Sequence, residues 1–134
     1  MILIDAGPFI AIANPDDPAH SAALETLGTC DAPLVSTWPV LAEAAWILRS
    51  QPSAVYEMMR GFISGVFQLR HLDSESLVWI AKFLQKYESN RAQLADASLM
   101  YIAEQEKIEA IFTLDRRDFS VYRTSRNRAL KIVP

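Results

Sequence analysis

Short apolar segments recur along the chain, and stretches typical of helices separate each one from the next. The segments that predict strands are residues 1–4, 34–35, 67–72, 110–114 and 130–133. Short apolar strands that alternate with helices indicate a mostly parallel sheet whose two faces are covered by helices. The sequence therefore predicts an α/β fold, a three-layer α/β/α sandwich around a mostly parallel sheet.

The helices are predicted from proline positions, capping residues and apolar spacing. They are expected at residues 8–14, 18–27, 39–49, 53–64, 73–88 and 94–107, with a short helix or turn at 116–122. Asp17 is expected to cap the second helix, and Ser36 or Thr37 the third. Residues 89–93 are expected to form a polar loop.

Length and composition predict one domain over residues 1–134 that folds without disulfide bonds, because the chain has a single cysteine. No apolar run is long enough for a membrane span, so we expect a soluble, cytoplasmic protein. The net charge of −3 is unevenly distributed. Residues 115–134 hold six basic and two acidic side chains, so the remainder is strongly acidic.

Four carboxylates stand where the pattern predicts the rim of the buried sheet: Asp5, Glu43, Asp96 and Asp115. Asp5 and Asp115 each end an apolar strand, and in parallel sheets function gathers beyond the carboxyl ends of the strands. Each carboxylate also has an ordinary explanation. Glu43 could reach solvent, and the three aspartates could cap helices or form turns.

Glu43 carries the strongest individual signal. Its helical neighbours Val40, Trp46 and Ile47 are all apolar, which predicts that Glu43 points toward the core or a cleft. Converging carboxylates repel one another unless a cation or protons intervene. Oxygen ligands without Cys or His favour Mg²⁺ or Mn²⁺, and Mg²⁺ commonly acts on phosphate groups.

The segments that carry these acids resemble the PIN-domain ribonucleases, and among them the VapC-type toxins of bacterial and archaeal toxin-antitoxin pairs. The matching segments are ILIDAGP at 2–8, LAE at 41–43, LADASL at 94–99 and IFTLDRRDF at 111–119. Their order and spacing cover nearly the whole chain. The resemblance implies a PIN-like α/β/α sandwich with an acidic pocket that binds Mg²⁺ or Mn²⁺.

By this resemblance, Asp5, Glu43, Asp96 and Asp115 line the pocket, and Thr113 is the supporting hydroxyl near the fourth acid. The implied activity is endoribonuclease cleavage that leaves 5′-phosphate and 3′-hydroxyl ends. The implied partners are a second copy in a homodimer and a cognate antitoxin. The chain departs from the family pattern at Ala6, where many members have a hydroxyl residue. Asp118 is either an auxiliary acid or a turn residue.

Five arginines near the C-terminus form a candidate track for the RNA backbone: Arg116, Arg117, Arg123, Arg126 and Arg128. The alternative is a solvated face that pairs with the acidic remainder of the chain. His20 and His71 are isolated from the acidic motifs. Apolar positions on the helix pair at 39–64 are better candidates for a protein interface than for RNA stacking.

Two other functions fit a small domain with strand-end acids. One is a catalytically inactive PIN-like domain that binds RNA or serves as a scaffold, although such a domain has little reason to keep four acids. The other is a phosphoacceptor module of the response-regulator type. That class needs adjacent acids after the first strand and a lysine after the last strand, whereas Asp5 stands alone and Lys131 lies inside the last predicted strand.

Overall fold

The protein, described over residues 1–134 by a computed structural model, is built around one five-stranded sheet. The strands are β1 (Ile2–Ile4), β2 (Leu34–Thr37), β3 (Phe67–Arg70), β4 (Ala110–Phe112) and β5 (Lys131–Val133). Their order is β3-β2-β1-β4-β5, and every neighbouring pair is parallel. All five predicted strands are present.

This strand order also separates the fold from the response-regulator type. Those modules have the order 2-1-3-4-5, in which the first strand lies between the second and the third. Here β1 lies between β2 and β4. The phosphoacceptor alternative is therefore wrong at the level of topology.

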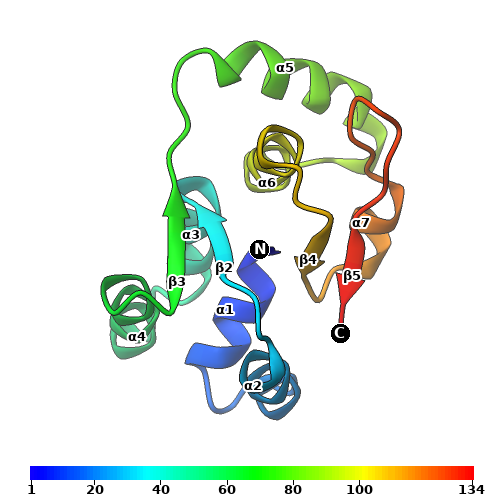
Figure 1. The fold of residues 1–134 in the computed structure, drawn as a ribbon. Helices are drawn as coiled ribbons and strands as arrows, with labels where there is room; N and C mark the ends of the chain where they lie inside the picture. The colour runs from blue at the N-terminus through cyan, green and yellow to red at the C-terminus, as the bar shows by residue number, and fades with distance from the viewer.

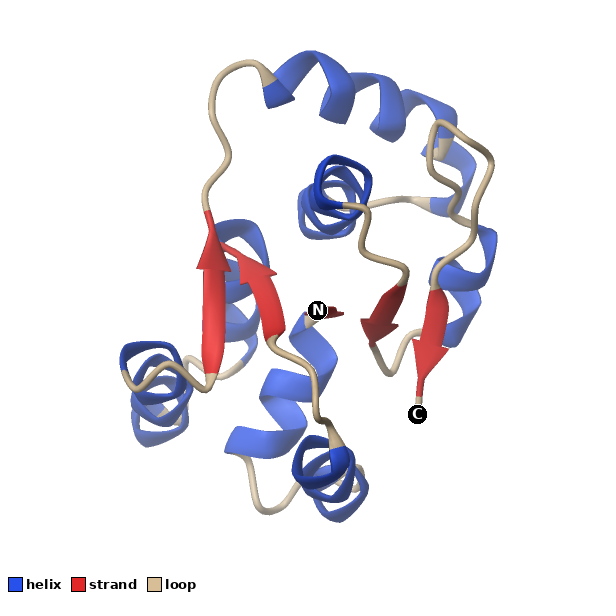
Figure 2. Ribbon diagram, viewed as in Figure 1, coloured by secondary structure: helices blue, strands red, loops and turns tan.

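Seven α-helices and one 3-10 helix surround the sheet. They are α1 (Ala6–Ala13), α2 (His20–Thr29), α3 (Trp38–Ile47), α4 (Pro52–Ile63), α5 (Ser76–Lys86), η1 (Glu88–Asn90), α6 (Leu94–Glu106) and α7 (Arg116–Val121). Figure 1 shows α5 and α6 on one side of the sheet and α1, α2 and α4 on the other. Figure 2 shows the same arrangement, with the red strands between blue helices. The predicted three-layer sandwich is confirmed.

Local hydrogen bonds explain where the helix boundaries differ from the predicted ones. Asp17 does not cap α2: its carboxylate accepts from the Ala19 backbone N–H at 2.8 Å in a turn, so the helix begins at His20. At α5, the Ser76 hydroxyl donates to the Asp73 carbonyl at 2.7 Å, and the helix begins three residues later than predicted. The predicted polar loop follows η1, which ends at Asn90.

The third helix has its N-cap at Thr37, but the Thr37 side chain makes no cap hydrogen bond. Its hydroxyl lies 2.6 Å from the Ser98 hydroxyl on α6, and the Ser36 hydroxyl donates to the Ile4 carbonyl at 2.9 Å. Both predicted capping hydroxyls are buried and connect elements instead. Tertiary packing has overridden a local capping preference here.

The buried apolar residues form one cluster on the two faces of the sheet. Strands β1 and β4 contribute fully buried Leu3, Ile4 and Ile111. On the α4 side, a Cβ built at Gly61 would lie 2.5 Å from the Phe67 ring, so only glycine allows α4 to pack this closely on β3. No helix combines the length and apolar character that a membrane crossing requires.

Candidate active site

The four predicted acids come from four separate elements and line one open cavity of about 790 Å³. Asp5 follows β1 and is the N-cap of α1, while Asp115 follows β4 and is the N-cap of α7. Glu43 lies on α3, and Asp96 lies in the first turn of α6. The structure thus brings together at the carboxyl end of the sheet all four residues that the sequence singled out.

Asp5 is the only buried carboxylate of the chain, with 6% of its surface exposed. Its Oδ1 atom is buried and has no hydrogen-bond partner, while Oδ2 accepts from the Thr113 hydroxyl at 2.9 Å. The pKa of Asp5 is raised to about 7, mainly by burial and also by the negative charges of Asp96 and Glu43, while the Ala6 backbone and the Thr113 hydroxyl act in the opposite direction. The site therefore holds an unsatisfied acid that is half-protonated near neutral pH.

Thr113 connects the first and fourth acids. Its hydroxyl donates to Asp5 and accepts from the Asp115 backbone N–H at 3.0 Å. Many family members have a hydroxyl residue directly after the first acid, where this chain has Ala6. The Asp5 carboxylate is instead supported by Thr113. The departure from the family pattern leaves Asp5 with hydrogen-bond support.

Asp96 both caps its helix and lines the cavity. Its Oδ2 atom accepts from the Gln93 backbone N–H at 3.1 Å and from the Tyr122 hydroxyl at 3.0 Å. Burial is the main reason that the pKa of Asp96 is raised, and the charge of Asp115 adds to the effect. Asp96 therefore caps its helix, as the ordinary explanation predicted, and the capping hydrogen bond also orients its carboxylate in the cavity.

Tyr122 was missed by sequence reasoning. It is fully buried at the end of α7 and packs edge-on against Phe83, Tyr87 and Phe119. A buried tyrosine hydroxyl needs a partner, but nothing local in the sequence shows that its partner is Asp96. The hydroxyl joins the aromatic cluster to the acidic cavity.

Glu43 is half-buried, and burial and the charge of Asp96 raise its pKa. The apolar face that suggested its orientation is only partly packed, however. Val40 is buried, but Trp46 and Ile47 are 66% and 52% exposed. The prediction that Glu43 faces a cleft agrees with its place in the cavity, but the reason was partly wrong, because two of its three apolar neighbours form exposed surface.

Asp115 is exposed, so the expectation of four acids at a buried rim was wrong for this residue. Its Oδ1 atom accepts from the Asp118 backbone N–H at 3.0 Å, which is the helix cap that the ordinary explanation predicted. Asp118 also lines the cavity, and burial and the charge of Asp115 raise its pKa. It is therefore a fifth acid of the cavity as well as a helix residue.

Of the five candidate arginines, only Arg116 and Arg117 line the acidic cavity. The Arg116 guanidinium contacts the Pro134 carbonyl, and Arg117 is exposed. Arg123, Arg126 and Arg128 line two other hollows. Arg91, which follows η1 with a positive φ of 55°, lines the acidic cavity and was missed inside a polar loop. The predicted cluster of five does not gather at this site.

His20 and His71 lie outside the acidic cavity, as the sequence indicated. The ring Nδ1 of His20 is 2.7 Å from the Ala11 carbonyl. His71 is exposed in the segment after β3. Neither residue can take part in the chemistry of the four acids.

The cavity suits a hard cation in its donor chemistry, but it is not a preformed cage. No three His, Cys, Asp or Glu side chains of the chain lie close enough together to hold a metal ion as they stand. The unpartnered Asp5 Oδ1 on the cavity wall nevertheless needs a counter-charge or a proton. Mg²⁺ commonly binds through one or two carboxylates and keeps several waters, so these residues fit such an ion without a closed ligand set.

Comparison with known proteins agrees with the motifs. No family model matches the chain. The chain is 26% identical to Ribonuclease VapC26 of Mycobacterium tuberculosis (strain ATCC 25618 / H37Rv) over 136 residues, which is 99% of this chain and 100% of the relative.

Two crystal structures have the same fold. Mycobacterium tuberculosis VapC20, a Sarcin-Ricin loop cleaving toxin, aligns with a TM-score of 0.79 and 17% identity, over 87% of this chain and 92% of that one. VapBC2 from Rickettsia felis, bound to a DNA fragment from their promoter, aligns with a TM-score of 0.68 and 14% identity over the full length of both chains. The chain is thus similar over its full length to a VapC ribonuclease and has the fold of two VapC-type structures, and the four acids that carry the resemblance line one cavity.

Proposed function

We propose that this chain is a metal-dependent endoribonuclease, the toxin of a toxin-antitoxin pair. The observation that carries the proposal is the buried, unpartnered Oδ1 of Asp5 in a cavity that also holds Glu43, Asp96 and Asp115. An uncompensated buried carboxylate destabilises a fold, so its presence needs a functional reason. The ribonuclease name of the full-length relative supports the same activity.

In the proposed site, Asp5 and Asp96 hold the ion, and Glu43 and Asp115 bind it directly or through water. The ion is Mg²⁺ or Mn²⁺. Once bound, it would supply positive charge for the phosphodiester and make an attacking water more nucleophilic. The remaining contributions come from the chain's own side chains.

Neighbouring groups restrict the orientation of the two principal acids. Thr113 holds Oδ2 of Asp5, which leaves the buried Oδ1 without a hydrogen-bond partner. Gln93 and Tyr122 both donate to Oδ2 of Asp96. Hydrogen bonds of this kind around a ligand restrict its orientation and tune its basicity. Arg117 at the edge of the cavity can contact a phosphate and offset part of the acidic charge.

The test is cleavage of labelled RNA by the purified protein. We expect cleavage with Mg²⁺ or Mn²⁺, loss of cleavage with a chelator, and a loss of about 100-fold or more for Asp5→Asn or Asp96→Asn, because each removes a proposed ligand. Asp16→Asn, on an exposed loop, is the matched control. Circular dichroism verifies folding, and end-labelling should find 5′-phosphate and 3′-hydroxyl products.

The same experiment distinguishes the proposed ribonuclease from a catalytically inactive domain. A non-catalytic RNA-binding or scaffold domain would bind RNA without cutting it, with or without added metal. Cleavage that survives both aspartate substitutions would exclude this cavity as the active site. Cleavage lost in every variant, including Asp16→Asn, would indicate a general folding defect.

The proposed partners are an RNA substrate, a cognate antitoxin and a second copy of the chain, and the proposed place of action is the cytoplasm. Support for a protein partner comes from the VapBC2 neighbour and from large apolar side chains left exposed on α3 and α4, namely Trp46, Ile47, Tyr56 and Ile63. Light scattering should give twice the 15.0 kDa mass of one chain. Trp46→Ser combined with Ile63→Ser should weaken association with the second copy of the chain or with the antitoxin.

A further inference from the structure

Two adjoining hollows lie outside the acidic cavity. The larger, of about 950 Å³, lies between the end of α6, the start of β4 and the segment 124–131. The smaller, of about 140 Å³, lies against α5. Both are lined by Thr124 and Ser125, so the two hollows adjoin at these residues, and we call the pair the basic depression.

Cations dominate the lining of this depression. Lys82, Lys86 and Arg123 line the smaller hollow, and Lys107, Arg126, Arg128 and Lys131 line the larger one. The only acids in the two linings are Glu104 and Glu109. Seven cations against two acids, in a chain with a net charge of −3, make this a strongly positive region of an acidic protein.

The two acids neutralise little of that charge. Glu104 is occupied by local hydrogen bonds, since it accepts from the Trp79 indole N–H at 2.6 Å and from the Ser125 hydroxyl at 2.9 Å. Glu109 pairs with Arg128 at 3.6 Å, but its side chain is 80% exposed, so the pair is weak. Lys82 and Lys86 make no ion pair, and Arg126 makes none either, although its charge helps to lower the pKa of Glu104.

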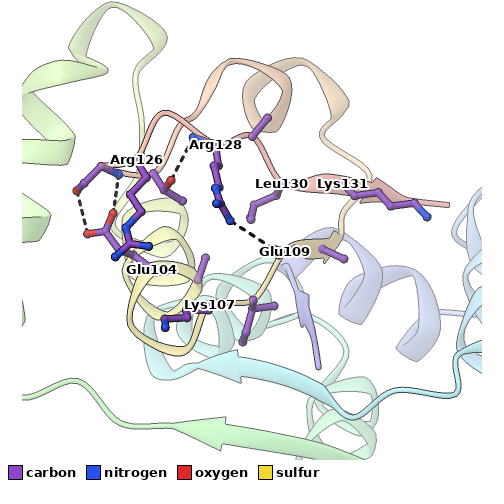
Figure 3. A pocket seen from close by; sticks show the side chains of 13 residues that line it. Glu104, Lys107, Glu109, Arg126, Arg128, Leu130 and Lys131 are labelled. Carbon is purple, nitrogen blue, oxygen red and sulfur yellow. Dashed lines mark hydrogen bonds and ion pairs between the residues drawn. The ribbon is translucent and has the colours of Figure 1, made fainter.

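Figure 3 shows how the cations of the larger hollow lie. The side chains of Arg126 and Arg128 extend from the C-terminal segment toward α6, Lys107 lies at the end of α6, and Lys131 points away. All four are exposed, so their charges remain solvated. These cations can therefore bind an anion without the desolvation cost that a buried charge would carry.

The basic depression is connected to the acidic cavity along the surface. Tyr87 lines the smaller hollow, and Arg91, four residues later, lines the acidic cavity. The short helix α7 makes a second connection, with Arg117 at the acidic cavity and Arg123, just after the helix, at the smaller hollow. Cations thus continue from the edge of one site into the other.

We propose that the basic depression binds backbone phosphates of the RNA substrate, in a part of the strand away from the bond that is cut. This proposal rests on the proposed ribonuclease function. An acidic cavity repels a polyanion, so affinity for RNA must come from cations outside it, and lysine and arginine contacts with phosphate supply most of the non-specific affinity for nucleic acid. A protein partner fits less well, because lysine is depleted at the centres of protein interfaces.

The test compares two double variants in the non-cleaving Asp5→Asn background, with a fluorescent mixed-sequence RNA of about 20 nucleotides. Lys86→Ala with Arg126→Ala removes two cations of the depression, and Arg49→Ala with Arg60→Ala removes two exposed cations elsewhere. Lys107 is left unchanged because it is the C-cap residue of α6, where a substitution could change the end of the helix.

We expect the depression variant to bind this RNA about tenfold more weakly than the control variant. The slope of log affinity against log salt, from about 50 to 200 mM, should become shallower by about 1.4, or 0.7 for each lost phosphate contact. Equal affinities and slopes for the two double variants would overturn the proposal. So would a variant that loses binding to a polyglutamate peptide but keeps full binding to RNA.

A second measurement uses the same pairs of substitutions with Asp5 intact. The depression variant should show a raised KM and an unchanged kcat for the long RNA, and unchanged kinetics for a dinucleotide, which contains only the bond that is cut. Equal losses on long and short RNA would contradict a separate site. If the wild type binds RNA through the basic depression but does not cleave it, the result excludes the proposed ribonuclease activity and still supports the proposed binding site.

Discussion

The acidic cavity and the basic depression lie at different ends of the same strands and are built in different ways. Acids from four separated segments meet beyond the carboxyl ends of β1 and β4, and one of them, Asp5, is buried. The basic depression lies near the starts of β4 and β5, and the heads of its lysines are exposed. The acidic cavity thus contains a buried carboxylate, whereas the lysines of the basic depression are exposed to solvent.

The difference shows what each kind of site requires. A buried carboxylate must be held by fixed donors, as Thr113 holds Asp5, because its ionised form opposes folding. Exposed lysines and arginines need no such support, because water solvates them until a ligand arrives. We therefore expect substitutions in the acidic cavity to have large and specific effects, and single substitutions in the basic depression to have small ones.

The largest effect is expected for Asp5→Asn in metal-free protein. Because burial raises the pKa of Asp5 to about 7, the folded protein keeps a proton between about pH 4 and 7 that the unfolded chain releases. The free energy of unfolding of the wild type should therefore fall as the pH rises through this range. Asparagine does not ionise, so the variant should be more stable at pH 8, by up to roughly 4 kcal/mol.

Urea denaturation at about pH 4, 6 and 8 measures this difference. It should become small near pH 4, where Asp5 is protonated in the folded chain and about half-protonated in the unfolded chain. Asp16→Asn is the control, because it makes the same substitution on an exposed side chain. A stability difference that stays constant over the whole pH range would show that ionisation of Asp5 does not oppose folding.

Thr113→Val should have the next largest effect. The substitution removes the donor to Asp5 and the acceptor for the Asp115 backbone N–H, so cleavage should fall about 10- to 100-fold. Ser36→Ala is the matched control, since it also deletes a buried hydroxyl, one that donates to the Ile4 carbonyl rather than to an acid. Equal losses of cleavage in the two variants would mean that the Thr113 effect is one of packing.

Tyr122→Phe should have a smaller effect of the same kind. It keeps the ring in the aromatic cluster but removes the hydrogen bond to Asp96, so we expect about a tenfold loss of cleavage and weaker Mn²⁺ binding in a direct titration. Tyr87→Phe is the control, because the Tyr87 hydroxyl accepts from the Arg123 backbone and touches no acid. Unchanged Mn²⁺ affinity in Tyr122→Phe would argue against a positioning role.

Arg128→Ala should have the smallest effect. Its ion pair with Glu109 is exposed on both sides, so the free energy of unfolding should change by less than about 1 kcal/mol. A thermal or urea unfolding curve measures the change. A loss of several kcal/mol would mean that the Arg128 side chain contributes strongly to folding stability. The basic depression would then not differ from the acidic cavity in its sensitivity to substitution.

Local sequence predicted the fold well, and it singled out four acids that the structure gathers in one cavity, because both depend on apolar patterning. The short apolar runs marked all five strands, and the strand ends marked Asp5 and Asp115. The same reasoning placed the start of α2 incorrectly, because turns and caps both use aspartate. It also overestimated the burial of Asp115, since an acid after a strand can face solvent from a helix cap.

The sequence could not predict which exposed cations share a surface. Arg126 and Lys86 are forty residues apart, and no apolar pattern surrounds either one, yet the shared Thr124 and Ser125 place them in one depression. The five arginines of the C-terminal stretch looked like one track, but the structure divides them between the acidic cavity and the basic depression.

The sequence by itself determined the order of strands and helices and singled out the four candidate acids, because burial imposes a periodicity that is visible along the chain. Only the tertiary structure decided that Thr113 supports Asp5, that Tyr122 supports Asp96, and that lysines from α5 join arginines from the C-terminal segment. Hydrogen-bond partners and surface neighbours depend on how helices and strands pack. Packing brings together residues whose proximity no local sequence pattern predicts.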